Sequence, residues 1–191
     1  MKYTVLMGSP RKEGNTNSIL MPVLDEIKKA GHSYDLFYLY DMKLEGCRAC
    51  RSCQKDWTSF GCPLDDDLKT IFDSIIKNDR IIFATPIYTW YCTAPLKAVM
   101  DRLVYTMNKY YGDEKGPSLW AGKHLSLILT CGYEIEKGTR IFEEGIKMYC
   151  KHSKLIYDGM FAERDLGYNH TFMDNEKEAR ARKYALELLE K

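Results

Sequence analysis

Continuous apolar runs alternate with segments of helical periodicity along this chain, and this alternation constrains the fold more than any other feature. Residues 3–7 (YTVLM), 36–40 (LFYLY), 80–85 (RIIFAT) and 124–130 (HLSLILT) are predicted strands, and residues 154–161 are a weaker fifth. The runs are apolar throughout instead of alternating, which is typical of strands buried on both faces of a parallel sheet.

Apolar residues at helical spacing fill the intervals between these runs. The predicted helices cover residues 19–27, 64–75, 96–107, 141–149 and 176–189. Pro22 weakens the first helix locally, whereas Pro95 is well placed in the first turn of the third. Five β–α units in this order predict a doubly wound α/β fold, formed by a single domain over residues 1–191.

Composition excludes several classes of protein. A chain of 191 residues with 45% hydrophobic content can bury a full core. No charged start followed by an apolar run is visible, and no apolar stretch is long enough to span a bilayer, so we expect a cytoplasmic protein. The net charge of +1, from 28 basic and 27 acidic residues, argues against nucleic acid or an anionic membrane as a partner.

Four cysteines fall within a loop at about residues 41–63. Cys47, Cys50 and Cys53 form two successive C-x2-C steps, and Cys62 follows, directly before Pro63. Repeated C-x2-C steps favour a [4Fe–4S] cluster. Zinc is a competing interpretation, but its sites usually place their cysteine pairs farther apart. A set of free thiols or a reversible disulfide would also account for the four cysteines.

The loops that follow the first, third and fourth strands carry unusual chemistry. Residues 8–18 (GSPRKEGNTNS) lead from a strand into a helix and are rich in hydroxyls and amides, which favours a phosphate cradle. An ordinary polar helix cap would explain the same residues without a ligand. Neither a Walker A motif nor the three-glycine dinucleotide fingerprint is present.

Aromatic residues dominate the loop after the third strand. Tyr88, Trp90 and Tyr91 lie between two prolines, where a planar ring system could stack, although such residues often belong to a core or an interface. The loop after the fourth strand adds Tyr133. Cys131 in that loop has no well-placed histidine partner and is better explained as a packing residue.

Three acidic residues, Asp65, Asp66 and Asp67, follow Cys62 closely. They could tune the potential of a cluster downward. The stronger interpretation is that they complement the dipole of the helix that follows.

The segments GSPRKEGNTN, TPIYTWYCTAPLKAVMDR and TCGYE resemble the NAD(P)H-dependent FMN reductase and multimeric flavodoxin-like superfamily, and CRACRSC is similar to its iron–sulfur flavoprotein branch. The resemblance implies a flavodoxin-like fold with strand order 2-1-3-4-5. It also implies FMN, with the phosphate in the loop at residues 9–18 and the ring against residues 86–91. Homodimers or homotetramers are typical of the family.

On this resemblance the chemistry belongs to the flavin, and no catalytic side chain is predicted. The residues predicted to bind FMN are Ser9, Arg11, Asn15, Thr16, Asn17, Ser18, Pro86, Ile87, Tyr88, Thr89, Trp90, Thr130, Cys131, Gly132 and Tyr133. The predicted cluster ligands are Cys47, Cys50, Cys53 and Cys62.

The predicted function is an FMN-dependent oxidoreductase or electron-transfer flavoprotein that passes electrons between a reduced donor, FMN and a [4Fe–4S] cluster. NAD(P)H is a candidate co-substrate, and the partner is a small-molecule donor or acceptor or a redox protein such as ferredoxin. A second hypothesis is an NAD(P)H-dependent reductase of FMN, quinones or nitro compounds without a cluster. A third is a non-enzymatic flavin electron carrier or redox sensor.

Overall fold

The computed structural model describes residues 1–191, and its five strands form one parallel sheet in the order β2-β1-β3-β4-β5. This confirms the predicted doubly wound flavodoxin-like fold and its strand order. The strands are β1 (Lys2–Met7), β2 (Ser33–Tyr38), β3 (Arg80–Pro86), β4 (His124–Cys131) and β5 (Ile156–Arg164). The helices are α1 (Asn15–Lys29), α2 (Leu68–Lys77), α3 (Ala94–Met107), α4 (Ile135–Ser153) and α5 (Asn175–Leu189), with short 3-10 turns at Leu39–Asp41 and Ser52–Gln54.

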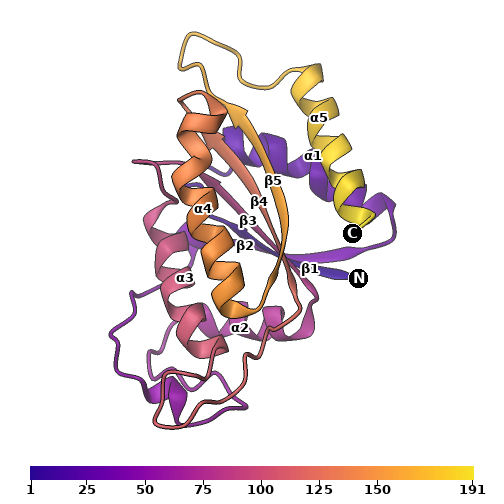
Figure 1. The fold of residues 1–191 in the computed structure, drawn as a ribbon. Helices are drawn as coiled ribbons and strands as arrows, with labels where there is room; N and C mark the ends of the chain where they lie inside the picture. Colours follow the sequence, from indigo (N-terminus) through magenta and orange to yellow (C-terminus); the bar gives the residue numbers. More distant parts are fainter.

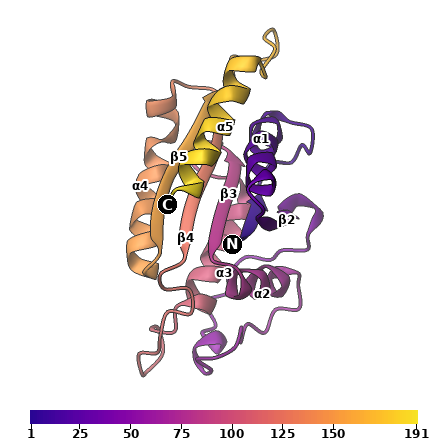
Figure 2. The ribbon, with the colours of Figure 1, turned by 90° about the vertical axis from the view of Figure 1, so that its right-hand side faces the viewer.

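Helices cover both faces of the sheet. Helices α1 and α5 pack together on one face, and α2, α3 and α4 lie on the other (Figures 1 and 2). Each face therefore has its own apolar core, which explains why the strands are apolar without alternation.

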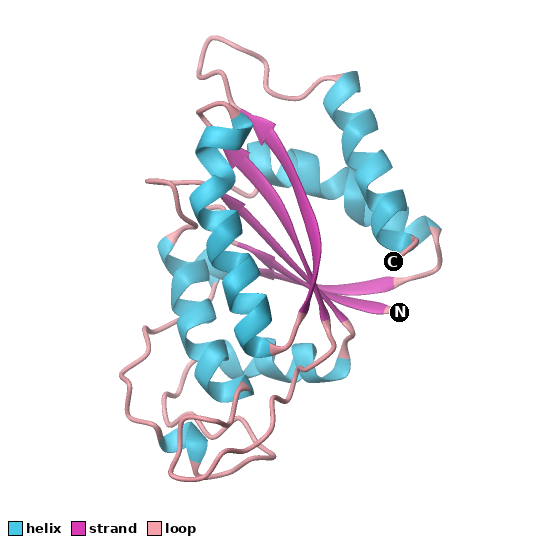
Figure 3. Cartoon of the chain, in the orientation of Figure 1, coloured by secondary structure: helices cyan, strands magenta, loops and turns pink.

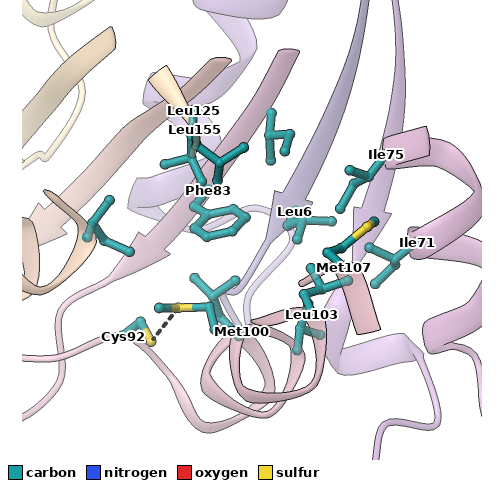
Figure 4. Packing of buried hydrophobic residues seen from close by; sticks show 14 of the residues in the cluster. Leu6, Ile71, Ile75, Phe83, Cys92, Met100, Leu103, Met107, Leu125 and Leu155 are labelled. Atoms are coloured by element: carbon teal, nitrogen blue, oxygen red, sulfur yellow. Dashed lines mark hydrogen bonds between the residues drawn. The ribbon is translucent and has the colours of Figure 1, made fainter. Parts of the chain in front are cut away.

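The larger core lies between the sheet and α2, α3 and α4. The side chains of Leu6 (β1) and Phe83 (β3) point toward α3, where Leu103 and Met107 belong to the same cluster. Ile75 of α2 lies beside them (Figure 4). All five side chains are fully buried. Burial of side chains of this size stabilises a fold by about 1.5–3 kcal/mol each, so this layer holds α3 firmly against the sheet.

Several element boundaries differ from the sequence prediction, among them those of β2, α2 and α4. β2 begins at Ser33 and ends at Tyr38, whereas the apolar pattern predicts residues 36–40. It is an edge strand whose only partner is β1, so its polar first residues remain partly exposed while they pair. Helix α2 begins at Leu68 instead of residue 64, and α4 begins at Ile135 instead of residue 141.

Two long segments pack together beyond the C-terminal end of α3 (Figures 1 and 3). One is the cysteine-rich loop between β2 and α2, and the other is the connection between α3 and β4. The side chain of Gln54 joins them, because its amide nitrogen donates to the carbonyls of Tyr105 (2.6 Å) and Asn108 (3.2 Å). None of the helices combines enough length with enough apolar character to cross a membrane.

Candidate functional site

Loops that follow four of the five strands meet at the carboxyl edge of the sheet and enclose a small cavity of about 80 Å³. A wider cavity of about 590 Å³ adjoins it and shares Arg11, Asn15, Tyr88 and Asp165 with it. The residues that line the small cavity are Ser9, Arg11, Asn15, Thr16, Pro86, Ile87, Tyr88, Thr130, Cys131, Gly132 and Asp165.

The first turn of α1 points at this cavity without a side-chain cap. Gly14 is the N-cap residue, and no acidic residue lies in the first turn. The first N–H groups of a helix have no intrahelical partner and carry the positive end of its dipole. The guanidinium of Arg11, which forms no ion pair, lines both cavities. An anionic group such as a phosphate fits this donor set.

Close packing joins the loop after β1 to the start of α3. Thr93, the N-cap residue of α3, donates its hydroxyl to the carbonyl oxygen of Gly8 at 2.7 Å. A Cβ atom at Gly8 would lie only 2.9 Å from the Thr93 oxygen and 3.2 Å from that of Thr85. Only glycine fits this contact without a shift, so the loop between β1 and α1 begins at a position fixed against β3 and α3.

The aromatic loop after β3 contains a tight turn. Tyr88 and Tyr91 exchange two backbone hydrogen bonds, and the residues between them, Thr89 and Trp90, both have left-handed backbone angles (φ 52° and 61°). The turn presents the Trp90 ring to Tyr133, with ring centroids 5.5 Å apart and planes 16° from parallel. Both rings stay exposed, at 42% and 58% of their surface.

Ten of the fifteen residues predicted to bind FMN line the small cavity. Asn17 and Ser18 lie in the first turn of α1 outside it, where Asn17 accepts a hydrogen bond from Tyr38 and Ser18 donates to the Asn15 carbonyl. The remaining predicted residues outside the lining are Thr89, Trp90 and Tyr133, which belong to the exposed aromatic turn and its stacking partner.

Cys131 lines the cavity but is buried, and its thiol donates to the carbonyl oxygen of Tyr133 at 3.4 Å. Burial raises the pKa of this thiol. The packing interpretation of its side chain agrees with this environment.

Asp165 is the lining residue that the sequence analysis missed. It follows β5, and its backbone N–H donates to the carbonyl of Cys131 at 2.8 Å, which draws the loop from β5 to α5 over the cavity. Tyr168, Gly167 and His170 in this loop line the wider cavity. Asp165 lies in a loop directly after a parallel strand, and this position could have identified it from the sequence.

The four clustered cysteines line one cavity of about 240 Å³, together with the C-terminal half of α3. Arg102 and Tyr105 form its inner wall, and Cys53 is buried while Cys47 and Cys50 are exposed. Hydrogen bonds from Ser52 lower the pKa of Cys50, whereas burial raises the pKa of Cys53.

No group of three or more histidine, cysteine, aspartate or glutamate side chains is arranged to hold a metal ion. A single zinc ion needs four ligands that converge on one point. In a [4Fe–4S] centre each of four thiolates binds a different iron, so the thiols surround a larger body instead of converging. Four thiols spread around one cavity therefore fit the donor set of a cluster better than that of zinc.

Acidic residues hold the cysteine-rich loop against α2 and α3. Asp66 accepts from Arg102 in a fully buried ion pair and from the backbone N–H of Glu45 at 2.9 Å. Asp67 accepts from the N–H of Lys43 at 2.7 Å. Since Asp66 is neutralised by a guanidinium, it does not place an unpaired negative charge beside the cysteines.

The two candidate sites lie at opposite ends of α3. Thr93 at its N-terminus contacts the loop after β1, and Tyr105 near its C-terminus lines the cysteine cavity. At 1.5 Å per residue, these positions are about 18 Å apart along the helix. Within one chain, the cavities are thus separated by most of the length of a helix.

Comparisons with known proteins agree with the fold and the motifs. The model of the NADPH-dependent FMN reductase family matches residues 1–148. An iron–sulfur flavoprotein of Methanosarcina thermophila is 34% identical over 112 residues, which cover 58% of this chain and 56% of that protein. An iron–sulfur flavoprotein of Methanocaldococcus jannaschii is 34% identical over 102 residues, 53% of this chain and 51% of that protein. The chain thus spans about half the length of the curated relatives it matches.

Among solved structures, an NAD(P)H:quinone oxidoreductase from Methanothermobacter marburgensis superimposes with a TM-score of 0.76 at 20% identity and covers 98% of both chains. At this identity the likeness supports the fold alone. The family model covers more than two thirds of the chain, and the two curated relatives at 34% identity are iron–sulfur flavoproteins. The chain therefore belongs to the NADPH-dependent FMN reductase family.

Proposed function

We propose that this protein is an FMN-dependent oxidoreductase that passes electrons between a reduced donor, FMN at the carboxyl edge of the sheet and a [4Fe–4S] cluster in the cysteine cavity. One observation carries the proposal: an uncapped helix N-terminus and the unpaired Arg11 face a cavity that opens beside exposed aromatic rings. When bound, FMN supplies two-electron or one-electron chemistry and a cluster supplies one-electron transfer.

The protein's contribution at the flavin site is binding and orientation. The backbone N–H groups of Asn15 and Thr16 and the guanidinium of Arg11 offer charge-assisted hydrogen bonds to a phosphate. Ser9 is already engaged, because its hydroxyl contacts both the N–H and the carbonyl of Arg11 at 3.2 Å and so fixes the loop. Tyr88, Trp90 and Tyr133 supply aromatic surface for a planar ring.

No second nucleotide cradle is evident, so we propose FMN in preference to FAD. NAD(P)H is a candidate donor, because the family model is that of NADPH-dependent enzymes. A small molecule or a redox protein such as ferredoxin is the candidate acceptor.

The separation along α3 favours assembly into a homodimer or homotetramer. Electron transfer weakens steeply with distance, and a second chain that brings its cysteine cavity to the aromatic turn would give a shorter route than α3 does. The exposed rings of Tyr88, Trp90 and Tyr133 provide apolar surface for such a contact. Sedimentation of the FMN-loaded protein at micromolar concentration tests this, and a monomer would contradict it.

The flavin assignment is tested by equilibrium binding of FMN to Arg11→Ala and Lys12→Ala proteins. Both substitutions remove one positive charge from the same loop, but Lys12 pairs with Asp41 and lines neither cavity. A hydrogen bond to a charged group contributes about 1.5–3 kcal/mol, so the dissociation constant should rise about tenfold to a hundredfold in Arg11→Ala only. Equal affinities in the two variants would refute the phosphate site.

The cluster assignment needs a separate experiment. Anaerobic reconstitution with iron and sulfide should give the parent and a Cys92→Ala control broad visible absorption and about four irons per chain, as expected of a [4Fe–4S] centre. The Cys50→Ser variant should lose much of the visible absorption and much of the iron. If the parent gains no iron, the reductase without a cluster becomes the better explanation. Negligible NAD(P)H oxidation by the FMN-loaded protein would instead favour the electron carrier.

A further inference from the structure

Lys109 is a buried cation without an anionic partner. Its side chain is fully buried behind the cysteine-rich loop, and its ammonium donates to the carbonyl oxygens of Cys53 (2.8 Å) and Ser59 (2.7 Å). No carboxylate lies within ion-pair distance of it. The carboxylate of Asp56, which belongs to the same loop, is exposed and is engaged by the hydroxyls of Thr58 and Ser59.

Arg102 is a second buried cation, and unlike Lys109 it lines the cysteine cavity itself. Its guanidinium pairs with Asp66 and donates to the Cys62 sulfur at 3.2 Å, while its buried Nε has no partner. A nitrogen that donates to the sulfur of a cluster ligand stabilises added negative charge on that sulfur. The guanidinium thus faces both a carboxylate and a predicted ligand.

The buried charges against the cysteine-rich loop do not balance while the cysteines are neutral thiols. Two buried cations, Lys109 and Arg102, lie against this loop, and only Arg102 has a buried carboxylate partner, Asp66. A buried cation without an anionic partner is unfavourable in a folded protein, so this arrangement favours further negative charge nearby. The thiols become thiolates when they bind metal, and four thiolates around a [4Fe–4S] core leave a net anion.

We propose that Lys109 and Arg102 are the buried countercharges of an anionic iron–sulfur cluster in the cysteine cavity, and that they raise its reduction potential. The proposal rests on the proposed cluster. Reduction adds one electron to a body that is already anionic, and fixed positive charge in a dry interior stabilises the more negative state. Both residues act as positioning and tuning residues and neither binds the metal.

The test compares the parent with Lys109→Met and Lys115→Met after anaerobic reconstitution. Lys115 belongs to the same connection between α3 and β4 but is exposed. Its variant therefore changes the net charge by the same amount and leaves the buried charge of Lys109 in place. Iron and sulfide content measures occupancy, and a redox titration with dithionite followed by electron paramagnetic resonance measures the potential. Neither readout depends on turnover.

At full occupancy, Lys109→Met should make one-electron reduction of the cluster at least tenfold less favourable, a fall of about 59 mV in potential for a one-electron couple. The potential of Lys115→Met should equal that of the parent. A fully occupied Lys109→Met cluster with the parental potential would overturn the proposal.

If Lys109→Met loses the cluster, the Lys109→Arg variant, which keeps the positive charge, shows whether the lost charge is the cause. Recovery of the cluster at the parental potential in Lys109→Arg supports the countercharge, whereas loss in both variants overturns it and leaves Lys109 as a clamp on the loop. A parent protein that takes up no iron and sulfide would instead overturn the proposed cluster itself, so the two failures are distinguishable.

Discussion

The side-chain hydroxyls of Thr16 and Thr130 lie 2.7 Å apart in the interior and join the first turn of α1 to the carboxyl end of β4. The two residues are 114 positions apart in the sequence. Their hydrogen bond holds the helix N-terminus over the edge of the sheet, where the loops after β3 and β5 complete the cavity. The Thr16 hydroxyl therefore orients the helix whose first backbone N–H groups face the cavity.

Thr16→Val and Thr130→Val should each destabilise the protein by about 1–3 kcal/mol, because each leaves one buried hydroxyl without a partner. The double variant should be less destabilised than the sum of the single variants, since both hydroxyls are then absent. Urea unfolding at neutral pH measures all four proteins. Additive effects would show that the two hydroxyls are satisfied independently.

The turn at Thr89 and Trp90 stores backbone strain, since a β-branched residue at φ 52° is unfavourable. Asparagine tolerates this conformation well. Thr89→Asn should therefore raise the free energy of unfolding by about 0.5–1 kcal/mol. Thr171→Asn, in the exposed loop before α5 and without a left-handed backbone, serves as the control and should change little. A less stable Thr89→Asn protein would show that the Thr89 side chain makes a contact that outweighs the strain.

The fold was predictable because its signals are local. Every strand run and helical face appears in the sequence, and the parallel arrangement follows from apolar character on both strand faces. The boundary errors have a physical cause. Ser33 joins β2 because it pairs with Lys2 across the sheet. Leu64 stays outside α2 because Asp66 and Asp67 accept hydrogen bonds from the backbone of residues 43–45. Both effects depend on contacts between distant segments.

The candidate sites were predictable only in part, for the same reason. Ser9 and Thr130 could be placed at one edge because both lie at the carboxyl ends of parallel strands. Asp165 could not be weighted above other loop acids without the hydrogen bond that draws it to Cys131. Lys109 looks like any surface lysine in sequence, and its burial arises from the packing of two segments more than 40 residues apart.

Thiol reactivity should distinguish the exposed Cys50 from the buried Cys92 and Cys150. Burial raises the pKa of Cys92 and of Cys150 to about 12, whereas hydrogen bonds from Ser52 lower the pKa of the exposed Cys50. At neutral pH the thiolate fraction is thus larger at Cys50 than at Cys92 or Cys150, and iodoacetamide should label Cys50 well before the buried pair in the cluster-free protein. Peptide mass spectrometry measures the order.

Unfolding in denaturant before labelling serves as the control, because all seven thiols should then react. Labelling of Cys92 in the folded protein at the rate of Cys50 would contradict the burial argument.

The buried pair of Arg102 and Asp66 should make the protein sensitive to acid and to the loss of either partner. Burial raises the pKa of Asp66, but the hydrogen bonds from Arg102 and from the N–H of Glu45 outweigh it and hold the pKa below its ordinary value. Its contribution to stability is therefore fully present above the unfolded carboxyl pKa of about 3.9 and is lost as the pH falls through the lower folded value. Asp66→Asn should show a weaker loss of stability in that acidic range.

Removal of Arg102 alone leaves a buried carboxylate uncompensated, so Arg102→Met should destabilise the cluster-free protein by about 3–5 kcal/mol at neutral pH. The double variant Arg102→Met with Asp66→Leu should recover much of this loss, because no unpaired charge remains. Lys69→Met is the matched control, since it breaks an exposed pair with Asp73 on α2 and should change stability by less than about 1 kcal/mol. Urea unfolding at several pH values measures each protein. If Arg102→Met were as stable as Lys69→Met, Asp66 would have to reach solvent in the unliganded protein, and the loop that carries Cys62 would not be held against α3 by this pair.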